Sequence, residues 1–94
     1  MSDKDIFKRL VDKGCALGLE KWVVEDVARY VIGHAPLGGY LEAVICNDLK
    51  GAFSRADETS MAEMPGLVKF LWNYVPSSCW GSKENYEMWL REES

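Results

Sequence analysis

The chain has 94 residues, enough for one domain with a single modest hydrophobic core. A hydrophobic fraction of 48% and a charged fraction of 28% are ordinary for a globular protein, and three prolines and eight glycines are too few for a low-complexity chain. The net charge is −4, and Lys and Arg form no cluster. Binding to a nucleic-acid backbone needs grouped cations, so the charge disfavours nucleic acid and favours a basic protein partner.

The sequence also predicts the compartment. Its longest apolar run is four residues, 43–46, whereas a membrane span needs about 20. The N-terminus, MSDKDIFKRL, alternates in charge and lacks the apolar centre of a secretory signal. We therefore expect no membrane contact and a location in the cytosol of the cell that makes the chain. Three cysteines, Cys15, Cys46 and Cys79, cannot all pair within one chain, so reduced and mostly buried thiols are expected.

Helical spacing of the apolar residues predicts one all-α domain over residues 1–94, a compact bundle of four or five short helices. The first helix is expected over about 3–13, because Ser2 and Asp5 resemble a capping box at its start. A second helix is expected over about 20–32, ended by Gly33 in the left-handed conformation.

The third predicted helix, about 39–56, has the clearest apolar stripe. The stripe consists of Leu41, Ile45, Leu49, Ala52, Phe53 and Ala56. The fourth helix is expected over about 60–75. Pro65 removes a backbone donor, so its regular part is expected mainly over 64–74, after a looser turn. Its apolar positions are Met61, Met64, Leu67, Val68, Leu71 and Val75.

A fifth helix is predicted over about 83–92, capped by Ser82, with Tyr86, Trp89 and Leu90 on its inner face. The preceding turn contains Cys79 and Trp80. Buried aromatic and thiol side chains supply much of the stability of a small core, so we interpret this turn as a packed corner. A pocket walled by Trp80 beside a thiol is the alternative.

Five residues are candidates for contact with a ligand or partner: Asn47, Asp48, Arg55, Asp57 and Trp80. Asp48 and Arg55 are two helical turns apart within the predicted third helix, and a guanidinium offers five donors to a carboxylate or phosphate. The structural interpretation is an internal clamp, in which Arg55 binds Asp48, Asp57 or carbonyls of the Cys79 corner.

Catalytic and metal-binding patterns are weak. His34 is the only histidine, so any thiol enzyme would pair it with Cys46 or Cys79, and no spacing favours that pair. Zinc ligation by the three cysteines and His34 lacks the paired short spacings of structural zinc sites. The glycine-containing segment 33–39 has neither the preceding strand nor the Lys-Ser/Thr ending of a phosphate loop. The sequence therefore predicts no enzyme, no cofactor and no metal.

About the last 50 residues carry a distinctive set of short motifs. They are Gly39-Tyr40-Leu41, Ala43-Val44, Asn47-Asp48-Leu49, Arg55-Ala56-Asp57, Asn73, Pro76, Cys79-Trp80-Gly81-Ser82 and Trp89-Leu90. This pattern resembles a set of small proteins encoded in phage and prophage genomes. Those proteins often have Pro after Gly-Ser, where this chain has Lys83.

The resemblance implies an origin in a mobile element, and it brings no settled activity with it. Small, acidic, cofactor-free phage proteins commonly occupy the surface of a host protein, so the leading hypothesis is a non-enzymatic accessory protein that binds a host or phage protein. Its target would include host antiviral defence complexes. The alternatives are a binder of a nucleotide signal that uses Arg55 and Trp80, and a thiol enzyme that uses Cys79 or Cys46 with His34. Four Trp, four Tyr and three Phe are many for so small a core, which leaves self-association open.

Overall fold

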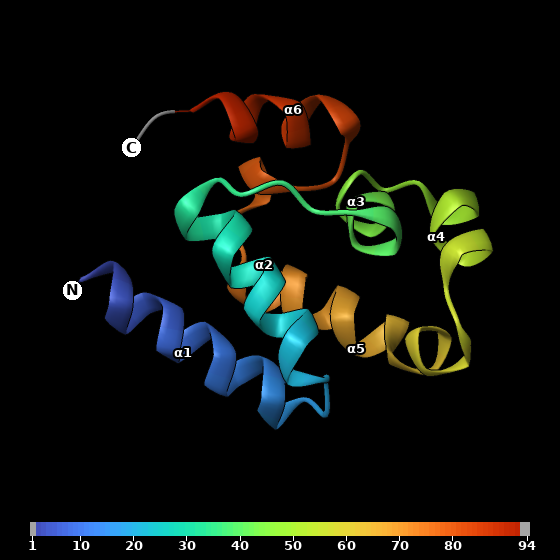
Figure 1. Cartoon of the computed structure of the whole chain (residues 1–94), viewed down its shortest axis with the longest axis horizontal. Helices are drawn as coiled ribbons and strands as arrows, with labels where there is room; N and C mark the ends of the chain where they lie inside the picture. The colour runs from blue at the N-terminus through green and yellow to red at the C-terminus, as the bar shows by residue number, and fades with distance from the viewer. Residues whose placement is uncertain (1, 93–94) are drawn as a thin grey trace.

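The computed structural model describes residues 2–92, which form six α-helices, one 3₁₀ turn and no strand (Figure 1). In chain order the elements are α1 (Asp3–Ala16), α2 (Lys21–Gly33), α3 (Gly39–Ile45), α4 (Leu49–Arg55), α5 (Glu58–Tyr74), the 3₁₀ turn η1 (Ser77–Cys79) and α6 (Lys83–Arg91). The prediction of a compact all-α fold is confirmed. The predicted number of helices is one too low, because the third predicted helix is two helices.

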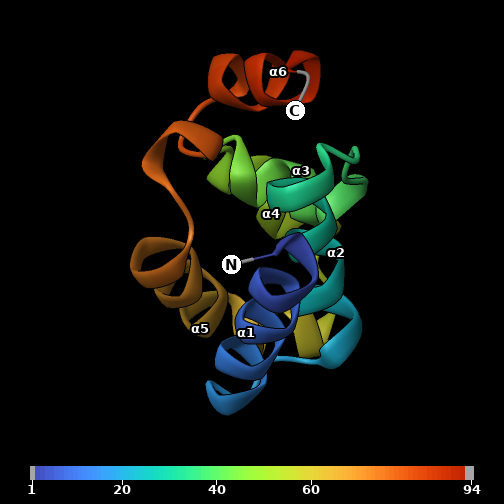
Figure 2. The same cartoon turned by 90° about the vertical axis from the view of Figure 1, so that its left-hand side faces the viewer.

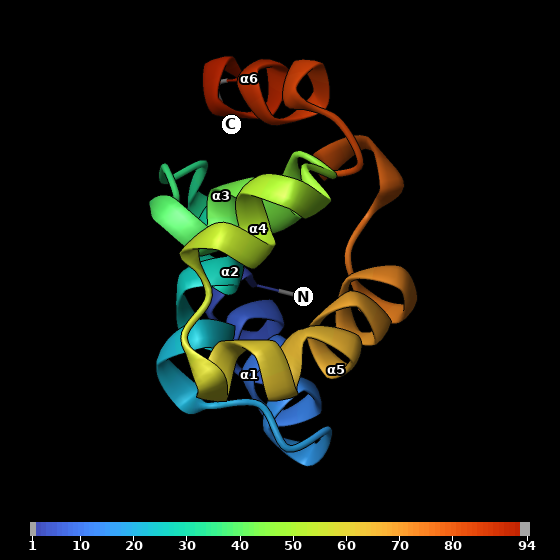
Figure 3. The same cartoon turned by 90° about the vertical axis from the view of Figure 1, so that its right-hand side faces the viewer.

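The helices are arranged in tiers. α1 packs against α2 and α5, α3 packs against α4, and α6 packs against η1 and α3. Seen from either side, α6 forms one end of the molecule, α1 and α5 form the other, and α3 and α4 lie between them (Figures 2 and 3). The principal extents are 36 × 29 × 19 Å.

Most side chains of the core come from α2, α3 and α5. Apolar residues recur on these helices at three- and four-residue spacing, so each helix turns a continuous face inward. Burial of a large apolar side chain contributes about 1.5–3 kcal/mol, and this term holds the helices together. The largest fully buried side chains are Tyr30, Phe70, Ile45, Leu67, Leu71, Val24, Val27 and Cys79.

The predicted caps at the two terminal helices are confirmed. Ser2 Oγ accepts a hydrogen bond from the Asp5 N–H at 3.3 Å, and Ser82 Oγ accepts one from the Asn85 N–H at 3.0 Å. Each bond satisfies a backbone donor that the first turn of a helix leaves free. The first helix nevertheless runs three residues further than predicted, to Ala16.

The end of α2 differs from the prediction by one residue. The left-handed residue is His34, with φ 55°, and Gly33 is still helical. Histidine is among the residues that adopt this conformation more readily than most. Here it is fixed from two sides, because its N–H donates to the Tyr30 carbonyl and its Nδ1 donates to the Trp89 carbonyl at 2.8 Å.

The predicted single helix over 39–56 is wrong, because it is interrupted between α3 and α4. Asn47 has φ 60°, which ends α3, and Asp48 Oδ1 accepts from the Gly51 N–H at 2.9 Å, which starts α4. The carbonyl of Ile45, left free at the end of α3, accepts a hydrogen bond from the Gly81 N–H at 2.7 Å. Asn and Asp side chains can form local hydrogen bonds with the backbone that compete with a continuous helix. Here the bond to Asp48 starts a new helix, and the helix that began at Gly39 does not continue.

The prediction of a loose turn before Met64 is also wrong. α5 is helical from Glu58, and Pro65 lies inside it. Its first turns are held from outside: Asp57 Oδ1 accepts from the Ser60 N–H at 2.7 Å, and Tyr40 Oη donates to the Ser60 carbonyl at 3.1 Å. These contacts stabilise the turns preceding the proline despite the backbone bond that proline removes.

The predicted packed corner before α6 is confirmed. Cys79 is fully buried, and Trp80 is half-buried against the core. Tyr30 Oη donates to the Cys79 carbonyl at 2.6 Å, and Trp89 Nε1 donates to the Tyr30 carbonyl at 2.9 Å. Tyr86 Oη accepts from the Leu37 N–H at 3.0 Å and lies 3.2 Å from the carbonyl of the same residue, to which it donates. These bonds join α2, η1, the 35–38 connector and α6, and all but the Trp89 bond are buried.

We expect Gly14→Ala to destabilise the protein, because α1 and α2 are in contact at this glycine. A Cβ at position 14 would lie 2.5 Å from both γ carbons of Val24, which is fully buried. Overpacking of this kind costs about 1–3 kcal/mol, which exceeds the gain in helix propensity. Gly66→Ala is the control. Its Cβ would come no closer than 3.5 Å to another side chain, so urea unfolding should show a small gain. Equal effects of the two substitutions would contradict the close approach.

Tyr86→Phe should lower the free energy of unfolding by about 1–3 kcal/mol, because it leaves the buried backbone groups of Leu37 without a partner. The control is Tyr74→Phe. Tyr74 is exposed, and its ring packs on Phe70 with centroids 5.9 Å apart, a contact that the substitution keeps. A Tyr86→Phe variant as stable as the Tyr74→Phe variant in urea would show that the corner does not depend on this hydroxyl.

Candidate functional site

Three of the five predicted site residues lie at helix boundaries. Asn47 ends α3, Asp48 caps α4 and Asp57 caps α5, and all three are exposed. Hydrogen bonds from Ser60 lower the pKa of Asp57, because they stabilise its charged form. The carboxylates of the two aspartates are therefore engaged in holding the backbone, which explains their presence without a ligand.

Asp48 and Arg55 line one hollow of about 410 Å³, which they share with Glu42, Ala43, Cys46, Lys83 and Tyr86. Trp80 and Asp57 are not among the residues that line it. The predicted Arg55 clamp is wrong: within residues 2–92 the guanidinium forms no ion pair or hydrogen bond, and the Cys79 carbonyl is bound by Tyr30 instead. The hollow therefore does not bring Arg55 together with Trp80, the pair on which the nucleotide hypothesis depends.

The thiols and the imidazole are not arranged as a catalytic pair. Burial raises the pKa of the Cys79 thiol to about 11, and burial together with Glu42 raises the pKa of Cys46. A thiolate nucleophile needs the opposite shift. His34 Nδ1 is bound to the Trp89 carbonyl, and its ring packs on Trp89 with centroids 4.7 Å apart. The expectation of mostly buried cysteines holds only for Cys79, since Cys15 is exposed and Cys46 is half-buried.

The described part of the chain contains neither a metal-binding cluster nor a membrane-spanning helix. No group of three or more His, Cys, Asp or Glu residues there could hold a metal ion. No helix over residues 2–92 has the length and apolar character needed to cross a bilayer.

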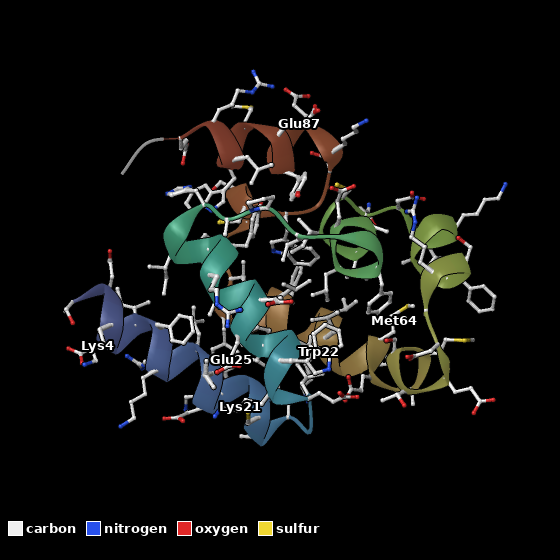
Figure 4. All side chains as sticks on the ribbon, in the orientation of Figure 1. Lys4, Lys21, Trp22, Glu25, Met64 and Glu87 are labelled. Atoms are coloured by element: carbon white, nitrogen blue, oxygen red, sulfur yellow. The ribbon has the colours of Figure 1, made fainter. Side chains whose placement is uncertain are left out.

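The most distinctive surface is apolar and lies on α4 and α5. We name it the α4–α5 apolar surface; it consists of Leu49, Phe53, Met61, Met64, Pro65, Val68 and Trp72. Its centre is a hollow of about 500 Å³ lined by Phe53, Met61, Met64, Pro65 and Val68. Figure 3 shows α4 lying above the first half of α5, and Figure 4 shows Met64 between the two helices.

The side chains of this surface are far more exposed than apolar residues of a helix usually are. Trp72 is 78% exposed, Leu49 is 71% exposed and Phe53 is 60% exposed. Scattered apolar residues are normal on a protein surface, but a contiguous patch indicates a contact site. Within the described residues, this surface is the feature that best fits a binding function.

Two features of the sequence conceal this surface. Leu49 and Phe53 continue the stripe of Leu41 and Ile45, which predicts a buried position, yet the break at Asn47 turns α4 so that both side chains face outward. On α5, two apolar faces have overlapping spacing and are predicted as one. The inner face contains Leu67, Phe70 and Leu71, while the outer face contains Met61, Pro65, Val68 and Trp72. The sequence did carry one signal for this surface: the segment that forms α5 is apolar nearly all round, so one of its apolar faces could be exposed.

The raised pKa of Cys79 predicts a loss of stability at high pH. Folding favours the neutral thiol, so its contribution is complete below pH 9, the ordinary thiol value, and is lost as the pH rises through about 11. The free energy of unfolding should therefore fall more steeply over pH 9–11 in the natural protein than in a Cys79→Ala variant. Tyr30, whose pKa burial also raises, is present in both proteins. Cys15→Ala, at an exposed thiol, should keep the natural slope. Parallel profiles for the natural and Cys79→Ala proteins would contradict the assignment.

The geometry thus presents one exposed apolar surface, one polar hollow around Arg55, and one thiol, that of Cys79, shielded by the core. The chain was compared with protein-family models, with curated proteins and with solved structures, and none of them matches it.

Proposed function

We propose that this protein is a non-enzymatic accessory protein of a phage or other mobile element, and that it acts by binding another protein through the α4–α5 apolar surface. The observation that carries the proposal is the exposure of Leu49, Phe53 and Trp72 around one apolar hollow. Soluble proteins rarely leave such a patch uncovered, because each exposed apolar side chain forgoes the free energy of burial.

The composition of the surface supports a protein as the partner. Aromatic residues and methionine are enriched at the centres of protein interfaces, where charged residues are depleted. Here Phe53, Trp72 and two methionines line or flank the centre, and the nearest charges on α5 lie at the margins. Methionine is flexible and polarisable, so Met61 and Met64 can adapt to the shape of an incoming side chain.

The resemblance to phage-encoded proteins supports a more specific proposal. A small acidic protein with no cofactor can inhibit a larger assembly by covering a surface that the assembly needs, and a host antiviral defence complex is a target of this kind. This step rests on the sequence motifs and on the apolar surface together.

Binding of a nucleotide signal has less support. The hollow around Arg55 also contains Lys83, and two cations favour a phosphate. The same hollow contains Asp48 and Glu42, which oppose an anion, and Trp80 does not line it. Thiol catalysis has less support still, because the pKa of Cys79 is raised and its side chain is fully buried.

The proposal predicts that capture of a protein from a bacterial lysate depends on the α4–α5 apolar surface. The immobilised natural protein should retain a partner that a Phe53→Ser variant loses, because a central aromatic residue of an interface contributes about 2 kcal/mol or more. The retained proteins can be identified by mass spectrometry.

The matched control is Met88→Ser on α6, at the opposite end of the molecule. Met88 is also exposed, at 52%, but it lies outside the surface. It should retain the same partner as the natural protein. Equal recovery by the Phe53→Ser and Met88→Ser variants would reject the α4–α5 surface as the contact site.

A further inference from the structure

We propose that, when no other protein is bound, a second copy of this chain covers the α4–α5 apolar surface, with the two α5 helices packed antiparallel about a two-fold axis. The inference rests on the proposed function in that it uses the same surface. It goes further by naming the occupant of the surface in the free protein.

The first support is the order of charges along the outer face of α5. Glu58, Pro65 and Lys69 are spaced by seven and four residues, so they lie on one line along the helix, and all three are exposed. The acid is at one end of this line and the base is near the other, about 16 Å apart at 1.5 Å per residue.

This order is self-complementary. In an isologous interface, residue i of one copy contacts residue j of the other and the reverse also holds. When two α5 helices run antiparallel, Glu58 of each copy faces Lys69 of the other, which gives two opposite-charge pairs at the rim. A parallel pairing would instead place Glu58 against Glu58 and Lys69 against Lys69. The charges therefore select the antiparallel arrangement.

The second support is the apolar line beside these charges. Met61, Val68 and Trp72 have the same seven- and four-residue spacing, so they form a parallel ridge on the same side of α5. When Glu58 faces Lys69, the indole of Trp72 faces the junction of α4 and α5 in the other copy. Phe53 and Met61 line the apolar hollow there, and its volume of about 500 Å³ is in the range of ordinary binding pockets.

The arrangement accounts for the most exposed large apolar side chain that the structure describes. Trp72 is 78% exposed in a single copy and lies one turn beyond Val68, which lines the apolar hollow. The two-fold axis brings the indole of each copy against the Phe53 edge of the other copy's hollow. A partner protein would then compete with the second copy, so the monomer would be the form that binds it.

The test is sedimentation velocity of the full chain over a wide concentration range. The natural protein should sediment as a monomer–dimer equilibrium. Trp72→Ser should weaken self-association by about a hundredfold, because it removes two interfacial aromatic residues per dimer. Lys69→Glu should weaken it by about tenfold, because two attractive rim pairs become repulsive.

The decisive variant is the double substitution Glu58→Lys with Lys69→Glu, which exchanges the two charges. It should restore self-association to within about threefold of the natural protein, because each pair is attractive again. Met88→Ser should leave self-association unchanged. Circular dichroism of each variant checks that the helices remain, which is expected because all the substituted side chains are exposed.

A natural protein that is monomeric at every concentration, or a charge exchange that does not restore what Lys69→Glu removes, would overturn the antiparallel pairing. These outcomes are separable from failure of the proposed function. A monomeric chain whose partner capture still depends on Phe53 rejects the pairing alone. A dimer with the expected mutant pattern but no surface-dependent capture rejects the binding function and supports the pairing.

Discussion

The fold depends on one buried side chain, that of Tyr30. Its ring packs on Tyr86 with centroids 5.4 Å apart, its hydroxyl donates to the Cys79 carbonyl, and its own carbonyl accepts from Trp89 Nε1. One residue of α2 therefore holds both η1 and α6. The bond between the Tyr30 hydroxyl and the Cys79 carbonyl is buried, so its loss leaves an unsatisfied group at a cost of about 1–3 kcal/mol. These contacts fix α6 without the use of α4 or of the outer face of α5, the two elements of the proposed contact surface.

Much of the helical architecture could be predicted from local chemistry. Ser2 and Ser82 precede helices as caps, and the alternation of apolar residues at three- and four-residue steps placed the inner faces of α2 and α6. These features depend only on residues near in sequence. Where the predictions fail, distant contacts decide: Gly81 binds the free carbonyl of Ile45 at the break before α4, and Tyr40 holds the turn that precedes Pro65. Such contacts connect segments 20 or more residues apart, and no local pattern reveals them.

The candidate site could be predicted least. Periodicity identifies an apolar stripe but does not say what covers it, and a break of three residues is enough to turn Leu49 and Phe53 from the core to the surface. The predicted polar residues have a structural role at helix boundaries, which differs from the ligand or partner contact that the sequence predicted. Asn47, Asp48 and Asp57 stand out because helix boundaries need residues of those types. The recognisable polar residues therefore mark helix boundaries, while the proposed contact surface consists of residues that resemble an ordinary core.

The bond between Tyr30 and Cys79 joins residues 49 positions apart, and that between Trp89 and Tyr30 joins residues 59 positions apart. During synthesis at about 5–20 residues per second, α2 leaves the ribosome several seconds before either partner exists. Over that interval the hydroxyl of Tyr30 has only water as a partner, and its aromatic ring has no α6 to pack against. The contacts that fix α6 are therefore among the last that the growing chain can make, and any chaperone that shields the ring of Tyr30 would act before α6 emerges.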